Sequence, residues 1–169
     1  MIQSGYVRTM VRYNAWQNRQ VAESLSGLDA SALTKDRGAF FGSILGTLNH
    51  LLWGDQMWMS RWCLEVEKPT QEITETTEVC ATAAEWWAAR ATLDGRMRDW
   101  AEGLDDADLE GDLSWYSGAT GKDQSQPMWL CVTHMFNHQT HHRGQVHAML
   151  TAAGQSAPVS DLVFMSEDA

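Results

Sequence analysis

The hydrophobic positions of this chain repeat at steps of three and four residues in four long segments. In the first segment, Val7, Met10, Val21 and Leu25 share one stripe. This spacing is typical of an amphipathic helix, which turns about 100° per residue. The pattern predicts helices over residues 5–26, 42–64, 79–102 and 127–153.

Residues that favour helix ends support these bounds. Ser43 suits the N-cap of the second helix, and Pro127 suits the first turn of the fourth. Glycines that can stop a helix follow the first, third and fourth segments, at Gly27, Gly103 and Gly154.

The connections complete the predicted architecture. Residues 27–41 and 65–78 are polar linkers, whereas residues 104–126 place apolar residues between glycines and favour a short β-hairpin. The chain shows no internal repeat and no domain linker. We therefore expect one domain over residues 1–169: an all-α four-helix bundle with a short β-hairpin between the third and fourth helices.

The second predicted helix is apolar on two opposite arcs. One arc is rich in leucine and also holds Asp55, whereas the other holds His50 with Trp53 and Met57. A helix that is apolar on two sides is buried on two sides, so one arc would face the bundle and the other a partner subunit. Periodicity alone does not say which. If His50 faces the core, the leucine-rich arc becomes a dimer surface, where Asp55 would be easier to accommodate.

Charge and cysteine content exclude several classes of protein. The formal net charge is −10, which disfavours contact with a phosphate backbone and hence with nucleic acid. The three cysteines are widely spaced, without a CxxC pair, as expected for reduced thiols. No signal-peptide pattern and no apolar run of about 18 residues occurs. We expect a cytoplasmic protein that does not enter the membrane.

The histidines are concentrated in the fourth predicted helix, which holds five of the six. His138 and His142 are four residues apart and lie at or within the apolar face, so both imidazoles can converge on one metal ion. The pair His134 and His138 is the second choice. His141 and His147 point away from the apolar face and are expected in solvent.

A metal site needs a further ligand from another helix. His50 is the obvious candidate, although periodicity does not place it on the core side. Asn14 and Gln145 could orient a ligand by a hydrogen bond, and His134 could be a fourth ligand or a general base. Weaker expectations are a salt bridge or dimer contact for Arg143, core packing for Cys131, and a substrate pocket lined by aromatic residues: Tyr13, Trp16, Trp53 and Trp58.

Three sequence motifs resemble those of the DinB/YfiT-like family. They are NHQTHHRGQVHAML (137–150), GSILGTLNHLLWGD (42–55) and YNAW (13–16), in matching order and spacing. The resemblance implies a four-helix bundle, often dimeric, that binds a divalent metal, typically zinc or nickel, through three histidines. Carried over by position, these ligands are His50, His138 and His142. Members with known roles are S-transferases and isomerases that use a low-molecular-weight thiol such as bacillithiol or mycothiol.

These implications lead to three functional hypotheses. Three ligands with an open coordination position are typical of a catalytic metal site. The first hypothesis is a metal-dependent enzyme, either a thiol-dependent S-transferase or isomerase or a hydrolase, that acts on a small molecule as a homodimer. The second is a non-catalytic metal-binding dimer of a stress response. The third is a purely structural set of histidines.

Overall fold

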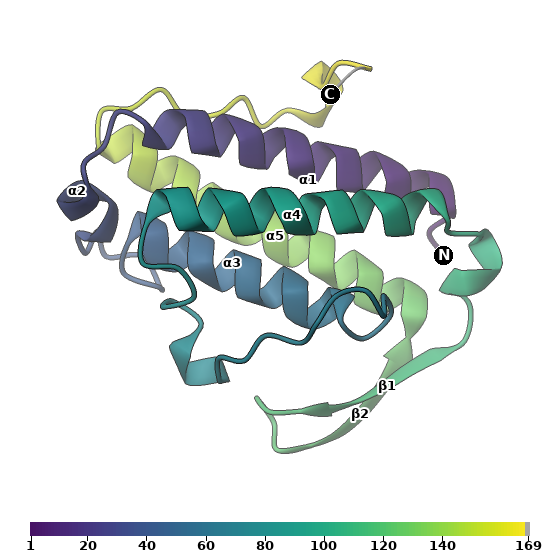
Figure 1. Cartoon of the computed structure of the whole chain (residues 1–169). Coiled ribbons are helices and arrows are strands. Elements are labelled where there is room, and N and C mark those ends of the chain that lie inside the picture. The colour runs from purple at the N-terminus through teal and green to yellow at the C-terminus, as the bar shows by residue number, and fades with distance from the viewer. Residues whose placement is uncertain (168–169) are drawn as a thin grey trace.

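Four long helices form the protein, which is described by a computed structural model over residues 1–167 (Figure 1). They are α1 (Ser4–Leu25), α3 (Ile44–Met59), α4 (Ala83–Glu102) and α5 (Met128–Ala152). Helix α1 packs against α4, and α3 packs against α5 and α4. The predicted four-helix bundle is confirmed.

Short elements lie in the connections between the helices and after α5. They are the α-helix α2 (Ala30–Thr34), three 3₁₀ helices, η1 (Ile73–Glu75), η2 (Asp106–Leu109) and η3 (Leu162–Phe164), and two strands, β1 (Asp112–Ser117) and β2 (Lys122–Pro127). The strands pair in antiparallel register with Trp115 opposite Gln124, which confirms the predicted hairpin. The hairpin extends below the N-terminal end of α5 (Figure 1). The linker 27–41, expected to be only a polar connection, contains α2.

Capping side chains fix where the helices start. The Ser43 hydroxyl accepts a hydrogen bond from the Gly46 backbone N–H (3.0 Å), as the sequence predicted. The Thr82 hydroxyl accepts one from the Glu85 N–H (3.2 Å), so α4 begins at residue 83 and not at 79. Helix α3 ends at Met59 and not at 64, and the chain then turns toward Cys63 through a Cys63 N–H bond to the Met59 carbonyl.

The leucine-rich arc of α3 lies in the core of the bundle and is not a dimer surface. Leu48 and Leu52 are 1% and 2% exposed, and the Trp86 indole N–H of α4 donates to the Leu48 carbonyl. The conditional expectation that this arc faces a partner subunit is therefore wrong. The opposite arc is covered by α5 and by the linker before α4, where the Trp53 indole N–H donates to the Gln71 carbonyl (2.9 Å). One chain thus buries both sides of α3.

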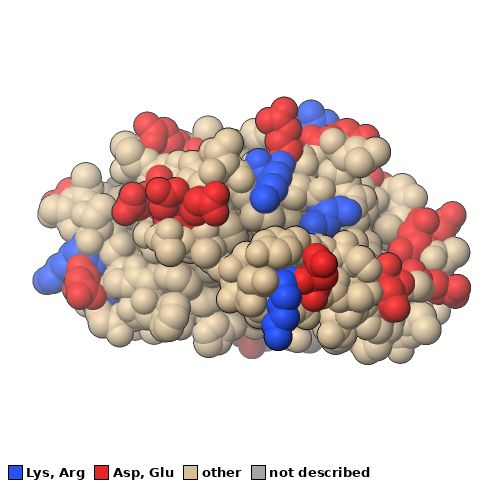
Figure 2. Space-filling view, turned by 90° about the horizontal axis from the view of Figure 1, so that it is seen from below, with Lys and Arg blue, Asp and Glu red and all other residues tan. Residues whose placement is uncertain are grey.

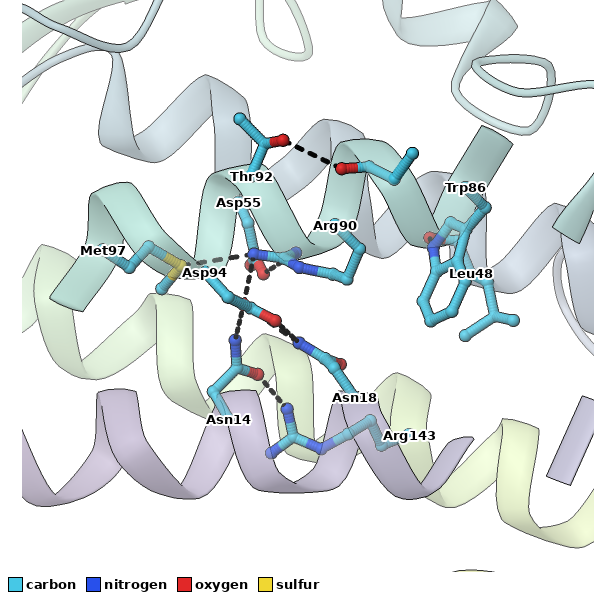
Figure 3. Close-up of polar contacts among 11 residues, drawn as sticks. Asn14, Asn18, Leu48, Asp55, Trp86, Arg90, Thr92, Asp94, Met97 and Arg143 are labelled. Atoms are coloured by element: carbon cyan, nitrogen blue, oxygen red, sulfur yellow. Dashed lines mark hydrogen bonds and ion pairs between the residues drawn. The ribbon is translucent and has the colours of Figure 1, made fainter. Parts of the chain in front are cut away.

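Asp55 is tolerated in the core because an arginine of α4 neutralises it. Arg90 lies 2.7 Å from Asp55 and 2.8 Å from Asp94, and all three side chains are buried. Asn18 of α1 donates to both carboxylate oxygens of Asp94, and Asn14 donates to one of them. Figure 3 shows these groups gathered between α1, α3 and α4. A buried ion pair held by further hydrogen bonds avoids the cost of an isolated charge.

Arg143 of α5 joins the same network. It is 7% exposed and donates to the side-chain oxygen Oδ1 of Asn14 (Figure 3). Its guanidinium carbon also lies 5.2 Å from the centre of the Tyr13 ring. The expected salt bridge is not found, because no carboxylate of residues 1–167 lies within 4.0 Å of Arg143. The formal charges of the two buried arginines, Arg90 and Arg143, and of the two buried aspartates, Asp55 and Asp94, therefore sum to zero.

The surface agrees with the acidic charge. On the face seen from below the bundle, acidic side chains are scattered over the surface, and the basic side chains among them form no continuous patch (Figure 2). Within residues 1–167, no helix is long and apolar enough to cross a membrane.

Candidate metal centre

Three histidines from two helices converge between α3 and α5. His50 comes from α3, and His138 and His142 come from successive turns of α5. One ring nitrogen of each lies within 4.8 Å of the others, and the Nε2 atoms of His50 and His138 are 3.0 Å apart. Three imidazoles at this separation can hold a divalent metal ion, whose bonds to nitrogen are about 2.0–2.1 Å long.

A glycine allows α5 to approach α3 this closely. Gly54 lies one turn after His50, on the same face of α3. A Cβ atom at this position would lie 3.0 Å from Cε1 of His138, which is shorter than an ordinary carbon–carbon contact of about 3.5–4.0 Å. The His138 ring therefore occupies the space that any larger residue at 54 would fill.

The outer nitrogens of two rings are fixed by hydrogen bonds. Nδ1 of His50 lies 3.1 Å from the Thr76 hydroxyl, and Nδ1 of His142 donates to Oε1 of Gln145 at 2.8 Å. A proton on Nδ1 leaves the lone pair on Nε2, which points at the cluster. Nδ1 of His138 is buried and has no hydrogen-bond partner within residues 1–167.

The environment keeps the rings neutral at physiological pH. Burial lowers the pKa of His50 to about 4, and the neighbouring His142 adds to the shift. Burial lowers the pKa of His138 to about 3, with further contributions from the other histidines, and it also lowers the pKa of His142. Only neutral imidazole binds a metal, so this donor set fits a divalent cation without first losing protons.

Aromatic rings close one side of the cluster. Phe41 stacks on His50 with ring centres 3.8 Å apart, and its ring lies 5.2 Å from that of His142. The other side opens into a cleft of about 810 Å³, lined by His50 and His138 but not by His142. This volume lies in the range of small-molecule sites, roughly 300–1,000 Å³. A ligand in the cleft would approach the cluster from the side of His50 and His138.

His134 and Gln145 lie next to the cluster. Gln145 makes the hydrogen bond to His142 described above. His134 lies in the wall of the cleft, with its ring 6.0 Å from that of His138 and 5.2 Å from Trp58. Burial lowers the pKa of His134, and the nearby charge of Arg61 lowers it further. His134 is therefore a neutral group at the edge of the site.

Asn14 and Tyr13 lie elsewhere. The hydrogen bonds of Asn14 go to Asp94 and Arg143, not to a histidine of the cluster. The Tyr13 hydroxyl donates to the Ser160 carbonyl (2.6 Å), which fastens the C-terminal segment along α1 (Figure 1). Asn14 and Tyr13 therefore serve packing between elements.

The remaining expectations divide between cleft and core. Trp53 and Trp58 line the cleft, whereas Trp16 packs beside Tyr13 with ring centres 6.0 Å apart. Cys131 is 3% exposed, and burial raises the pKa of its thiol, as expected for a core cysteine.

Several site residues were not identified from the sequence. Thr76 and Arg61 lie in or next to irregular segments, where no periodicity indicates which way a side chain points. Gly54 stands inside the motif GSILGTLNHLLWGD, so its position next to the ligands could have been suspected. Trp115 reaches the cleft only because the hairpin folds against it.

Comparisons with known proteins agree with this architecture. The DinB family model matches residues 1–169. The crystal structure of a DinB-like protein from Bacillus cereus ATCC 10987 superposes with a TM-score of 0.65, at 17% sequence identity, over 85% of this chain and 90% of that one. No curated protein matches the chain. On the match over its full length, the chain belongs to the DinB family.

Proposed function

We propose that the chain is an enzyme that binds one divalent metal ion, zinc or nickel, through His50, His138 and His142. The observation that carries the proposal is the three-imidazole cluster that opens on one side into a cleft of small-molecule size. When bound, the ion would act as a Lewis acid that lowers the pKa of a thiol or a water. A site made only for structure would be closed by a fourth protein ligand.

The residues around the cluster have separate tasks in this proposal. Thr76 and Gln145 hold two imidazoles in the orientation that points Nε2 inward. Phe41 covers one face of His50 and keeps water from that side. His134, neutral and in the cleft wall, can accept a proton from a thiol or a water bound nearby.

The reaction class that we propose first is thiol-dependent. A low-molecular-weight thiol would attack a small electrophile in the cleft, and His134 would take the thiol proton. In an S-transferase the bond from carbon to the leaving group breaks as the carbon–sulfur bond forms, whereas in an isomerase the thiol adds and is released again with its proton. Hydrolysis of a small electrophile by water is the second class. Support for the thiol comes from the motifs shared with the DinB/YfiT-like family. A cytoplasmic location and a homodimer are part of the same proposal. Sedimentation of the purified chain would check the homodimer.

The first test is metal content. The chain would be purified without a nickel column and analysed for metals, together with His138→Ala and the control His147→Ala. His147 lies on the same helix but outside the cluster. We expect about one zinc or nickel per chain in the wild type and in His147→Ala, and loss of it in His138→Ala. Wild-type protein without stoichiometric metal would refute the metal site.

The second test is turnover. The metal-loaded chain would be assayed with a panel of thiols and an electrophile such as monochlorobimane, and the same assay without thiol would detect hydrolysis. Turnover that falls in His138→Ala but not in His147→Ala supports the enzyme. Full metal occupancy without turnover across the panel would refute it and favour a non-catalytic metal-binding protein.

A further inference from the structure

The cleft beside the histidines contains a half-buried arginine held between two tryptophans. Arg61 follows the end of α3, and its guanidinium carbon lies 4.1 Å from the ring centre of Trp58 and 5.1 Å from that of Trp115. Trp58 belongs to α3 and Trp115 to β1, so the guanidinium is fixed between the helix and the hairpin. Stacking of this kind holds a planar cation in one orientation.

No anion of residues 1–167 pairs with this cation. Within residues 1–167, Arg61 has no carboxylate within 4.0 Å, its side chain donates no hydrogen bond, and its Nη1 is buried without an acceptor. Glu72 lines the same cleft but does not pair with Arg61. By contrast, Arg90 in the core contacts two carboxylates. Leaving a guanidinium partly desolvated and unpaired is unfavourable, and it is unusual in a chain with a net charge of −10.

The rest of the cleft lining combines aromatic and aliphatic side chains with exposed polar residues such as Lys68, Thr70 and Glu72. Besides His50, His134 and His138, its lining includes Met57, Pro69, Ile73 and the tryptophans at 53, 58 and 115. A ligand that fits this surface has a flat apolar body and one anionic group. The planar guanidinium of Arg61 suits a planar, singly charged carboxylate, whereas the other cation of the lining, Lys68, is exposed at the rim.

We propose that Arg61 binds the carboxylate of a small apolar carboxylic acid, whose body lies against the tryptophans and whose reacting end extends toward His50 and His138. The position of the reacting end rests on the proposed function. Binding of the carboxylate does not, because Arg61 is not a member of the histidine cluster.

The test uses the full chain freed of metal with EDTA, so that a carboxylate cannot bind to an ion. Phenylacetate and its neutral analogue 2-phenylethanol would be titrated while the indole N–H signals of the tryptophans are followed by NMR. We expect phenylacetate to bind about tenfold more tightly than 2-phenylethanol, as for one hydrogen-bonded ion pair at a partly exposed site. In Arg61→Met the two compounds should bind equally weakly.

Two variants with the same change of charge are matched controls. Lys68→Met removes an exposed cation from the rim of the same cleft, and Arg19→Met removes an exposed cation of α1 outside it. Both should keep the preference for phenylacetate. Arg61→Lys keeps the charge but not the planar fork, and should lose part of the preference. If circular dichroism shows that Arg61→Met does not fold, the proposal is tested by the preference for phenylacetate in Arg61→Lys and in the wild type.

The proposal is overturned if wild-type chain does not prefer phenylacetate, if Arg61→Met keeps the preference, or if Lys68→Met loses as much as Arg61→Met. Metal analysis separates this result from the proposed function. A chain that binds phenylacetate through Arg61 but holds no metal supports the anion site and refutes the metalloenzyme. A chain that holds metal but shows no preference for phenylacetate refutes only the anion site.

Discussion

Gly54→Ala tests whether the spacing of α3 and α5 sets the metal affinity. The added Cβ would lie 3.0 Å from Cε1 and 3.5 Å from Nδ1 of His138. Relief of that contact requires the ring to move by roughly 0.5 Å, given a normal carbon–carbon distance of about 3.5–4.0 Å. Metal–nitrogen distances tolerate only about 0.2 Å. We therefore expect zinc affinity to fall at least about tenfold, which corresponds to about 1.4 kcal/mol.

The stability of the metal-free chain should respond differently. Alanine is favoured over glycine inside a helix by about 1 kcal/mol, and an unligated His138 can turn away from the new methyl group. Displacing the His138 ring from its packed position has a cost that offsets this gain, so urea unfolding in EDTA should change little. Gly95→Ala in α4 is the matched control, because a Cβ there meets no atom within 4 Å. It should raise stability by up to about 1 kcal/mol and leave zinc affinity unchanged.

The assay is competition for zinc against a chelating dye, performed on wild type and both variants. Wild-type affinity in Gly54→Ala would contradict this expectation, since it would show that the histidines adjust freely to a wider helix spacing. Equal loss of affinity in Gly95→Ala would also refute it, because that substitution touches no ligand.

Two further predictions concern pH and the buried charges. The pKa values of His50 and His138 are lowered in the folded chain, to about 4 and about 3, from an ordinary value of 6.5. The folded chain therefore favours the neutral imidazoles, whereas the unfolded chain takes up protons near pH 6.5. The metal-free chain should lose stability as pH falls below about 6.5 toward these values. In urea unfolding with EDTA, the free energy of unfolding of His138→Gln should fall less steeply with decreasing pH than that of the wild type. Identical pH profiles for the two proteins would contradict the lowered pKa of His138. Asp55→Asn removes one of the two carboxylates that contact Arg90 and leaves its buried charge partly uncompensated. The free energy of unfolding, measured with urea, should therefore fall by roughly 3 kcal/mol. A change below 1 kcal/mol would show that Asp94 alone suffices.

Local sequence patterns were enough for the helices and for part of the site. The 3.6-residue repeat located all four long helices, and Ser43 marked the start of α3. The same repeat placed His138 and His142 on one face of α5, because residues four apart on a helix always neighbour each other. Helix ends without a clear cap signal were less accurate, as at Met59 and at Thr82.

The two apolar arcs of α3 show where periodicity reaches its limit. The pattern indicated burial on both sides but not what covers each side. In the folded chain, α4 covers the leucine-rich arc and supplies Arg90 to Asp55, whereas α5 and the linker at residues 65–78 cover the arc of His50. A partner subunit was not needed to explain either arc.

The helices, the hairpin and the pair His138 and His142 follow from local sequence, since each depends on neighbours close along the chain. The family motifs had named His50, but it is the packing of α3 on α5 that brings it to that pair, sets Thr76 behind it, and places Arg61 between a helix and a hairpin. These contacts join segments far apart in sequence, and their formation depends on how whole helices pack. No pattern within one helix contains that information.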